Sequence, residues 1–338
     1  MEKMSIPRPV FRVEWNGRDV TVDLSPYVSS VSYVDREEGE SDTLEIRLGD
    51  GDGRFRGDWY PTKGDRLRLR FGYEGNPSMR GGDFDLDEVT GDGPPDVVAL
   101  RGIAAGISRP LRTPESRAYE NTTLSDIARA VALRLGLSLV GEIDPIRIIR
   151  ETQSQEEDLA FLARVAGEYG YAFSARGDAI SFVKRGSLRD SPPVLTLRRG
   201  DITRYSVTDK ILRVARSASV VSHRPSSRET IRHDAPETRR AGPDISMDRL
   251  SPDLRAETPE QAMAKAAASL DAENEEGASL DLTLFGNPRL VAGVNFVLAD
   301  MGGFGGVWHI TESRHDMRKG AGYTTELRAI RARKDMVR

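Results

Sequence analysis

The sequence predicts a mainly β protein in which two antiparallel β-rich blocks, expected to be β-barrels, flank a small α+β module. Apolar and polar residues alternate in short segments over residues 10–110, which is the pattern of half-buried strands. Helical spacing replaces this alternation over residues 118–186, and the alternation returns in the C-terminal third. The 338 residues exceed what one hydrophobic core usually holds. We therefore expect three domains, at residues 1–115, 116–187 and 188–338.

The first block carries regularly spaced turn signals between its predicted strands. Asn16-Gly17 is typical of a type I′ hairpin turn, and Lys63-Gly64-Asp65 precedes an alternating segment that ends at Tyr73. Residues 97–107 are predicted as a last strand pair. Many short strands with glycine-rich turns are typical of a small barrel or sandwich.

The middle segment predicts two helices followed by a β-hairpin. The first helix begins after Asn121-Thr122-Thr123, and Gly136 stands where a helix-terminating glycine is expected. The second helix is predicted to begin at Ser154, because Glu157 three residues later would complete a capping box, and to end at Gly170. The segment therefore forms a small α+β module with a core of its own.

The third block is predicted to contain a long loop and a helix before its last strands. Residues 222–257 are rich in arginine, acidic residues and proline with few large apolar residues, which favours a long loop or extended insertion. A helix is predicted at residues 258–274, with Thr258 as its N-cap and Pro259 at its first position. The glycine-rich run at 302–306 precedes a strand and is expected to be a hairpin loop.

Composition excludes several classes of function. The 53 acidic and 49 basic residues leave a net charge of −4, which argues against binding nucleic acid through a basic face. The absence of cysteine excludes disulfides and thiolate chemistry. We expect no membrane span and no signal peptide, because no apolar run is long enough, and hence synthesis and folding in a cytoplasm.

One acidic run suggests a calcium loop but does not fit its pattern. Residues 81–96 contain six acids and no base, including Asp83, Asp85 and Asp87. A calcium-binding loop that starts at Asp83 would need glycine at its sixth position and glutamate at its twelfth, where this chain has Glu88 and Pro94. We interpret the run as a solvated acidic turn.

The sequence predicts no catalytic, cofactor-binding or metal-ligating residues and no cofactor. His309 is expected in an alternating strand and His315 in a polar turn, both with structural roles, and no Gly-x-Ser-x-Gly motif occurs. The three tryptophans, expected to be exposed, are too scattered for a sugar- or base-stacking platform; they are Trp15, Trp59 and Trp308. We therefore predict that the protein is not an enzyme.

The C-terminal region carries an ordered series of motifs. The series is Gly286-Asn287-Pro288-Arg289-Leu290-Val291-Ala292-Gly293, then Gly306-Val307-Trp308-His309-Ile310, then His315, and last Gly322-Tyr323-Thr324-Thr325-Glu326-Leu327. It resembles the signature of the phage late control protein D family, the baseplate hubs of contractile tails, which are related to the hub part of type VI secretion spikes. The likeness extends back through Gly64–Leu67, Phe71–Tyr73, Asn121–Leu124, Gln153–Leu162 and Glu168–Gly170, so it covers about residues 10–332.

The resemblance implies a structural baseplate hub of a contractile phage tail or a phage-tail-like injection particle. In such hubs each subunit contributes two barrels of tail-tube type, so that a homotrimer adapts the sixfold tail tube to the threefold central spike. The implied partners are the tail tube protein, a separate trimeric spike protein, baseplate wedge proteins and the tape measure protein. The implied location is the tail baseplate of a virion or tail-like particle that assembles in the host bacterial cytoplasm.

Two alternatives remain open at this stage. One is a tail-associated enzyme that degrades peptidoglycan, which would need a buried acid in a cleft. The other is a peptidoglycan-binding protein, because two short helices with flanking strands are similar to small glycan-binding modules. Residues 222–257 match nothing in the resemblance, and we expect them to contact wedge components or a neighbouring subunit.

Overall fold

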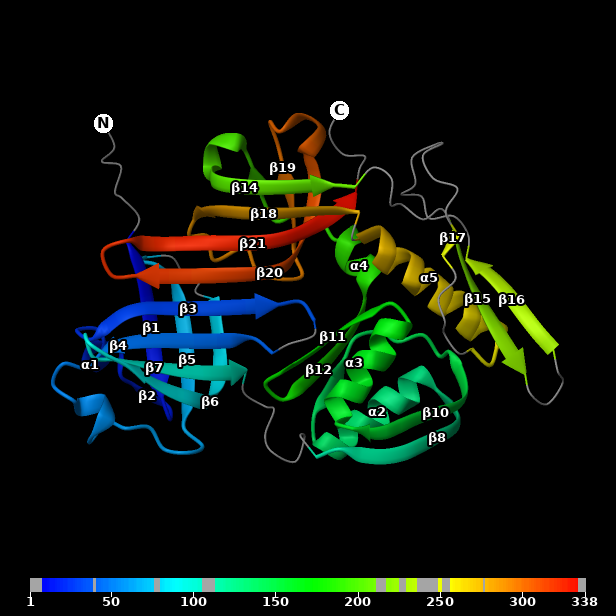
Figure 1. Ribbon diagram of the computed structural model, residues 1–338, viewed down its shortest axis with the longest axis horizontal. Coiled ribbons are helices and arrows are strands. Elements are labelled where there is room, and N and C mark those ends of the chain that lie inside the picture. The colour runs from blue at the N-terminus through cyan, green and yellow to red at the C-terminus, as the bar shows by residue number, and fades with distance from the viewer. Residues whose placement is uncertain are drawn as a thin grey trace.

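The computed structural model shows a broad sheet with a separate helical module beneath one end (Figure 1). It describes residues 8–38, 41–75, 80–104, 113–210, 217–224, 229–235, 249–250, 256–275 and 277–333. Among these residues, no helix has the length and apolar character needed to cross a membrane.

The first block folds as a curled antiparallel sheet. Its elements are β1 (Pro9–Trp15), β2 (Arg18–Asp19), α1 (Thr21–Leu24), β3 (Val28–Arg36), β4 (Thr43–Gly49), η1 (Arg54–Arg56), β5 (Arg66–Tyr73), β6 (Arg80–Asp92) and β7 (Val97–Ala104). The acidic run at residues 83–88 lies inside β6, so its prediction as a turn is wrong. The reason is pairing with β5, where Arg66 and Arg68 neutralise Asp85 and Asp83 from the neighbouring strand.

The second block completes the same sheet. Its elements are β13 (Thr196–Leu197), η3 (Arg199–Asp201), β14 (Ile202–Asp209), β18 (Ala278–Phe285), β19 (Asn295–Leu298), η4 (Gly302–Phe304), β20 (Gly306–Arg318) and β21 (Gly322–Arg333). The strand order is β14-β18-β21-β20-β3-β4-β7-β6-β5-β1-β2, with β19 and β13 attached beside β20. The mainly β class is confirmed, and both blocks share one continuous sheet of 13 strands.

The two blocks repeat one topology. In the first block, the successive strands β3, β4, β6 and β7 lie in the spatial order β3-β4-β7-β6. In the second block, β14, β18, β20 and β21 lie in the order β14-β18-β21-β20. In both cases a further strand, β5 or β19, pairs with the N-terminal half of the third strand. The chain therefore contains two copies of one strand arrangement, side by side.

The middle module separates the two blocks in the chain. It comprises β8 (Glu115–Thr123), α2 (Leu124–Leu135), β9 (Ser138–Val140), β10 (Arg147–Glu156), α3 (Asp158–Glu168), β11 (Tyr171–Arg176), β12 (Ala179–Lys184) and α4 (Arg185–Asp190). Thr123 caps α2 by accepting from the Asp126 backbone N–H, and Gly136 ends it with a φ of 68°, as predicted. The predicted start of the second helix at Ser154 is wrong, because residues up to Glu156 pair with β8 as a strand.

A long helix lies between the middle module and a small outer sheet. Helix α5 spans Pro259–Glu275, close to its predicted range, and the outer sheet contains β15 (Ser217–Arg224), β16 (Glu229–Ala235) and β17 (Arg249–Leu250). Part of the loop predicted at 222–257 is therefore strand. Ala218 and Val220 of β15 pack against α5, which lies later in the chain, so the local sequence pattern does not show that this sheet has an apolar core. The rest of this range, up to residue 255, lies outside the described residues apart from β17.

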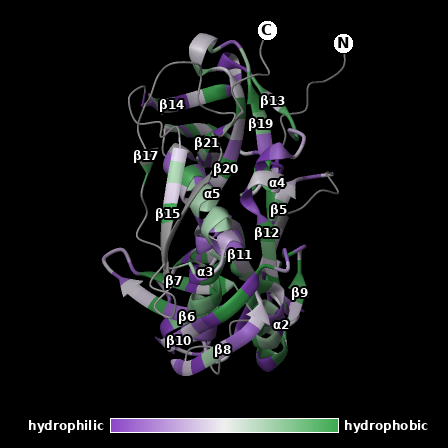
Figure 2. Ribbon diagram, turned by 90° about the vertical axis from the view of Figure 1, so that its right-hand side faces the viewer, coloured by the Kyte–Doolittle hydropathy of each residue, from purple (hydrophilic) through white to green (hydrophobic). Residues whose placement is uncertain are grey.

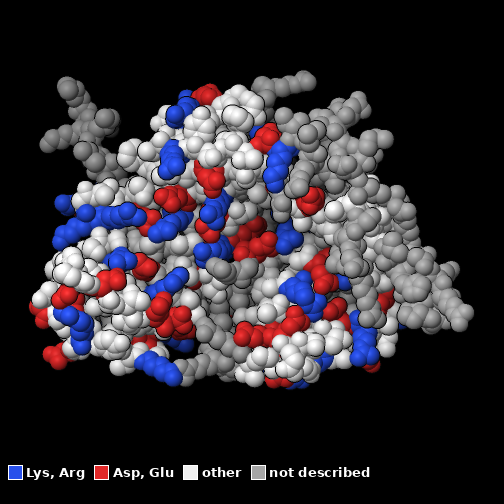
Figure 3. Space-filling model, viewed as in Figure 1, with Lys and Arg blue, Asp and Glu red and all other residues white. Residues whose placement is uncertain are grey.

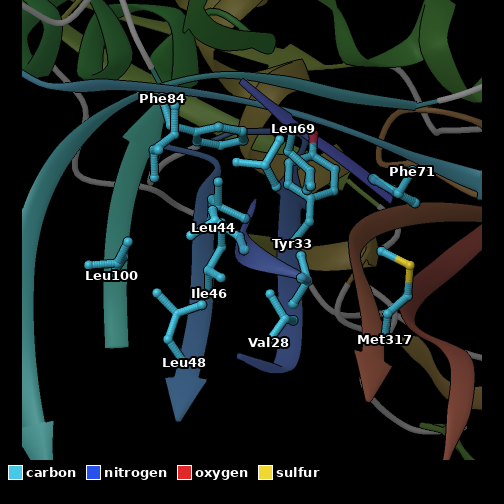
Figure 4. Packing of buried hydrophobic residues seen from close by; sticks show 14 of the residues in the cluster. Val28, Tyr33, Leu44, Ile46, Leu48, Leu69, Phe71, Phe84, Leu100 and Met317 are labelled. Carbon is cyan, nitrogen blue, oxygen red and sulfur yellow. The ribbon is translucent and has the colours of Figure 1, made fainter. Parts of the chain in front are cut away.

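Each part has its own core. The first block packs aromatic and aliphatic side chains such as Tyr33, Phe71 and Phe84 around Leu44 and Ile46 (Figure 4). Separate clusters fill the middle module, the second block and the contact between α5 and β15. Apolar and polar residues alternate along the strands, as the hydropathy colouring shows (Figure 2). The alternation places one face of the main sheet on the cores and leaves the other to solvent.

Candidate functional site: the seam between the two blocks

The two blocks meet where the C-terminal half of β20 pairs with β3. We call this pairing the seam; it joins residues 312–318 of β20 to residues 30–36 of β3, in antiparallel register from Glu312 opposite Arg36 to Arg318 opposite Ser30. The core-facing positions of the seam are His315, Met317, Val31 and Tyr33, and all of them are buried. The seam therefore fixes one block against the other through both backbone and side chains.

The C-terminal motifs of the sequence converge beside this seam. Gly286 donates its backbone N–H to the carbonyl oxygen of Tyr323 at 2.8 Å, and a Cβ at residue 286 would lie 2.0 Å from the Tyr323 ring. The Asn287 backbone N–H donates to Thr325 Oγ1 at 2.8 Å, and the hydroxyl of Tyr73, from the first block, donates to the Gly286 carbonyl at 2.6 Å. Glycine is required at residue 286, because any Cβ there would overlap the Tyr323 ring.

His315 occupies the centre of a buried hydrogen-bonded chain. Ser313 Oγ donates to the Leu290 carbonyl at 2.6 Å, so it accepts from His315 Nε2 at 2.9 Å. The remaining nitrogen, Nδ1, then accepts from the Tyr323 hydroxyl at 2.7 Å. Each hydrogen in this chain has an acceptor when the imidazole is neutral with its proton on Nε2.

Burial keeps His315 neutral. The side chain is fully enclosed, and the loss of solvation lowers the pKa of His315 to about 4. The ring packs against Tyr33 and Phe71 of the first block, with ring centroids 6.1 Å and 4.9 Å away. His315 therefore lies in a strand with a structural role, and its predicted place in a polar turn is wrong because β20 continues through it.

His309 forms a second buried polar chain across the blocks. Its Nε2 lies 2.8 Å from Glu37 Oε1, at the end of β3, and its Nδ1 donates to Asn295 Oδ1 at 2.7 Å. The amide nitrogen of Asn295 faces the carbonyl oxygens of Leu188, Arg189 and Ser191 at the C-terminal end of α4. This chain links the first block, the second block and the end of the middle module, in keeping with the predicted structural role of His309.

Asp35 is a third point where all three parts meet. Its carboxylate accepts from the guanidinium of Arg176, at the tip of the β11–β12 hairpin, at 2.7 Å. It also accepts from the backbone N–H of Ala292, in the second block, at 3.0 Å. Asp42 shares the same guanidinium at 3.0 Å. Burial raises the pKa of Asp35, although Arg176 opposes the change.

The solvent face of the main sheet carries interleaved charges on both sides of the seam (Figure 3). Arg328 lies between Asp281 and Glu312 at 3.6 and 3.8 Å, and Glu312 also pairs with Arg36 across the seam at 3.0 Å. In the first block, Arg101 lies 3.5 Å from Glu88. Exposed pairs of this kind contribute little stability each, but they leave the face without a strong potential of either sign.

A charged cavity of about 550 Å³ lies between β10, α3 and α5. Arg164 reaches Glu151, Glu156 and Glu168 at 3.3, 3.0 and 2.9 Å, and Lys265 of α5 reaches Glu168 at 2.6 Å. Burial raises the pKa of Glu151. These charges pair with one another, and the Lys265–Glu168 ion pair joins α5 to the middle module.

The residues singled out from the sequence fall in three places. His315 lies in the seam, His309 lies earlier in β20, and the acidic run lies in β6. Among the described residues, no three or more histidine or acidic side chains are grouped so that they could hold a metal ion. Trp308 is fully buried rather than exposed, and its indole N–H donates to the Phe304 carbonyl, which orders the glycine-rich hairpin loop. Asp35 and Arg176 were missed, because a single buried ion pair leaves no pattern in the chain.

Two curated relatives resemble the chain in sequence. A probable baseplate hub protein of Escherichia phage 186 is 30% identical over 210 residues, which are 60% of this chain and 53% of the relative. A probable baseplate hub protein of Escherichia phage P2 is 31% identical over 210 residues, with 60% and 54% coverage. The chain thus spans about half the length of the curated relatives it matches. No protein-family model matches the chain.

Solved structures extend the likeness over almost the whole chain at the level of the fold. A tail protein of Neisseria meningitidis superposes with a TM-score of 0.69 and 14% identity, over 96% of both chains. A component of the type VI secretion system of E. coli superposes with a TM-score of 0.59 and 11% identity, over 90% of this chain and 73% of the other. The resemblance to phage baseplate hub proteins that the motifs predict is therefore confirmed in sequence, and the fold is that of phage tail and type VI secretion proteins.

Proposed function

We propose that the protein is the baseplate hub of a contractile phage tail or a related injection particle. Its role would be structural rather than enzymatic: a homotrimer that joins the sixfold tail tube to a threefold central spike. The site of action would be the tail baseplate, after assembly in the cytoplasm of the host bacterium. The relatives carry the name of hub proteins rather than of enzymes, which supports this assignment.

One observation carries the proposal: a single chain holds two side-by-side copies of the same strand arrangement. Three such chains present six equivalent blocks, which a sixfold tube can meet, while the middle modules and α5 retain threefold symmetry. A protein with one block would have no means of matching the two symmetries. The seam supports the same role, because it fixes the angle between neighbouring blocks through buried hydrogen bonds.

The native mass of the full chain, alone and mixed with a candidate spike protein and a candidate tube protein, tests the proposal. Three copies of 37.3 kDa give about 112 kDa. A trimer, or a monomer that becomes trimeric when the spike is added, is the expected result. A monomer that binds neither trimeric spikes nor tube protein would refute the adapter role.

The remaining partners follow from the same architecture. We propose that baseplate wedge proteins bind outside the ring and that the tape measure protein ends inside it. Of the segment 222–257, the described parts of β15 and β16 pack beside α5, and we propose the segment as a contact to wedge proteins or to a neighbouring subunit. Deleting residues 225–255 should weaken either the assembly of hub trimers or the binding of wedge proteins. A variant that still forms trimers and binds wedge proteins as the full chain does would refute this assignment.

A further inference from the structure

The main sheet has two unpaired stretches at corresponding places in the two blocks. Strand β14 pairs with β18 on one side only, among the residues that the structure describes. Strand β6 pairs with β5 through residues 80–85, and beyond this stretch residues 87–92 pair with β7 alone. Most side chains of both stretches are exposed. Unpaired strand edges of this length are templates for another strand.

The internal repeat identifies these stretches as the counterparts of the seam. The third strand of the second block, β20, pairs with β19 through residues 306–309 and then with β3 through residues 312–318. The third strand of the first block, β6, follows the same course, with β5 as its first partner and no second partner among the described residues. A register shift also falls at the same place, between Leu86 and Glu88 in β6 and between Ile310 and Glu312 in β20.

The equivalence extends to side-chain chemistry. Each series starts at the residue directly after the register shift and passes to the residue paired with it on each neighbouring strand in turn. Both blocks give the same order of residue types, which is acid, arginine, acid and serine. The two series are Glu88–Arg101–Glu45–Ser32 and Glu312–Arg328–Asp281–Ser206. This match aligns β3 with β14 residue by residue, with Ser32 corresponding to Ser206.

We propose that a second copy of this chain docks here: residues 88–92 of β6 in one copy pair antiparallel with residues 206–210 of the next copy, repeating the seam between chains. The inference rests on the proposed function only for the number of copies in the ring. Each step across the main sheet between β14 and β6 is antiparallel, so β6 and the β14 of a copy placed alongside in the same orientation run in opposite directions. The contact is therefore head-to-tail, which is the kind that closes rings.

The transferred register makes specific pairs. Because Glu312 lies opposite Arg36 in the seam, Glu88 lies opposite Lys210 of the next copy. Thr90 then lies opposite Thr208 and Asp92 opposite Ser206, with Arg204 as the diagonal neighbour of Asp92. Residues 81–96, which include the acidic stretch of β6, contain no base, and this stretch thus meets a strand with Arg204 near its start and Lys210 directly after its end.

The core-facing side chains at the β14 edge are covered on one side only. Tyr205 is 40% exposed and Val207 is half-buried, although their register partners on β18 belong to the core. In the seam, the residues that correspond to Tyr205 and Val207 are Val31 and Tyr33, which are 0% and 6% exposed because β20 covers them. The residue opposite Val207 in the proposed pairing is Gly91, which leaves room for the exposed ring of Tyr205 beside it. Pairing would bury apolar surface that one copy leaves in water.

The absence of cysteine allows a direct test by disulfide trapping. Full-length Thr90→Cys protein is mixed with full-length Thr208→Cys protein under mild oxidation, and cross-linked dimer is measured on a non-reducing gel. Residues directly opposite in an antiparallel pair lie within the distance that a disulfide spans. Within one chain the two positions are seven strands apart, so an intramolecular bridge is excluded. The matched control replaces Thr208→Cys with Arg204→Cys, four residues out of register.

The expected result is several-fold more cross-link for Thr90→Cys with Thr208→Cys than for the offset control, or for either variant alone. Equal yields, or none, would overturn the pairing. Charge exchange is the second readout: Asp92→Arg or Arg204→Asp alone should weaken self-association, and the double exchange should restore it. A native trimer without the expected cross-link would refute this contact and leave the hub function standing; a protein that stays monomeric with spike and tube protein present, and never cross-links, would refute both.

Discussion

Replacing His315 with glutamine should change how the stability of the protein depends on pH. The pKa of His315 is lowered to about 4 in the fold, against 6.5 as its ordinary value. As the pH falls, His315 is therefore protonated near pH 6.5 in the unfolded chain but only near pH 4 in the folded chain. The free energy of unfolding decreases as the pH falls between these two values. The loss from this one group is about 2 kcal/mol between pH 7.5 and pH 5, and about 3 kcal/mol when complete. Glutamine can both donate to Ser313 and accept from Tyr323, but it does not titrate.

Urea unfolding of the wild type and of His315→Gln, followed at several pH values, tests this reasoning. The variant is expected to lose about 2 kcal/mol less than the wild type between pH 7.5 and pH 5, whatever its absolute stability. Asp35 provides a control of opposite sign: its pKa is raised by burial, so its contribution to stability is present at low pH and is lost as the pH rises through the folded value. Asp35→Asn should therefore make the protein lose more stability than the wild type on acidification. Parallel pH profiles for the wild type and His315→Gln would show that His315 is not held neutral by burial.

Three further predictions concern single contacts. Gly286→Ala should destabilise the protein by more than about 2 kcal/mol in urea unfolding, because its Cβ would lie 2.0 Å from the Tyr323 ring, whereas Gly303→Ala, with open space at Cβ, should cost less than about 1 kcal/mol. Arg176→Ala should speed amide hydrogen exchange at the β11–β12 hairpin severalfold, because it removes the ion pairs of Arg176 with Asp35 and Asp42 that hold the hairpin on the first block. Arg176→Lys should restore part of the protection, and equal exchange in all three proteins would contradict a role of these ion pairs. Thr123→Ala should cost about 1 kcal/mol through loss of the α2 cap, and an unchanged urea midpoint would refute the cap's role.

Alternation, capping residues and glycine positions were sufficient to predict the mainly β class, both blocks and the helices α2 and α5. They failed where a long-range partner decides the local structure. Ser154 and Glu157 have the spacing of a capping box, but residues up to Glu156 pair with β8 as a strand, so α3 begins at Asp158. The segment after residue 217 lacks a clear apolar pattern, because α5 supplies its cover from a different part of the chain.

The seam was predictable only in part. The motifs around Gly286, His315 and Tyr323 stood out as a family resemblance, while their convergence on one buried network depends on strand pairing that the sequence does not state. Asp35 and Arg176 are separated by 141 residues, and nothing in either neighbourhood marks them as partners. The charge repeat across the sheet is equally hidden, since each of its four residues comes from a different strand.

The residues that carry the resemblance to hub proteins lie inside the chain, and the proposed ring would explain why. Three copies close a ring only if each turns by about 120° relative to the last, so slack between the two blocks of a chain would accumulate around the ring. Apolar contacts alone tolerate sliding, because they have little directional preference. Hydrogen bonds between buried groups fix both distance and angle, and an unpaired one is costly. The seam, with His315 and Asp35 in it and His309 beside it, therefore holds the angle between the blocks.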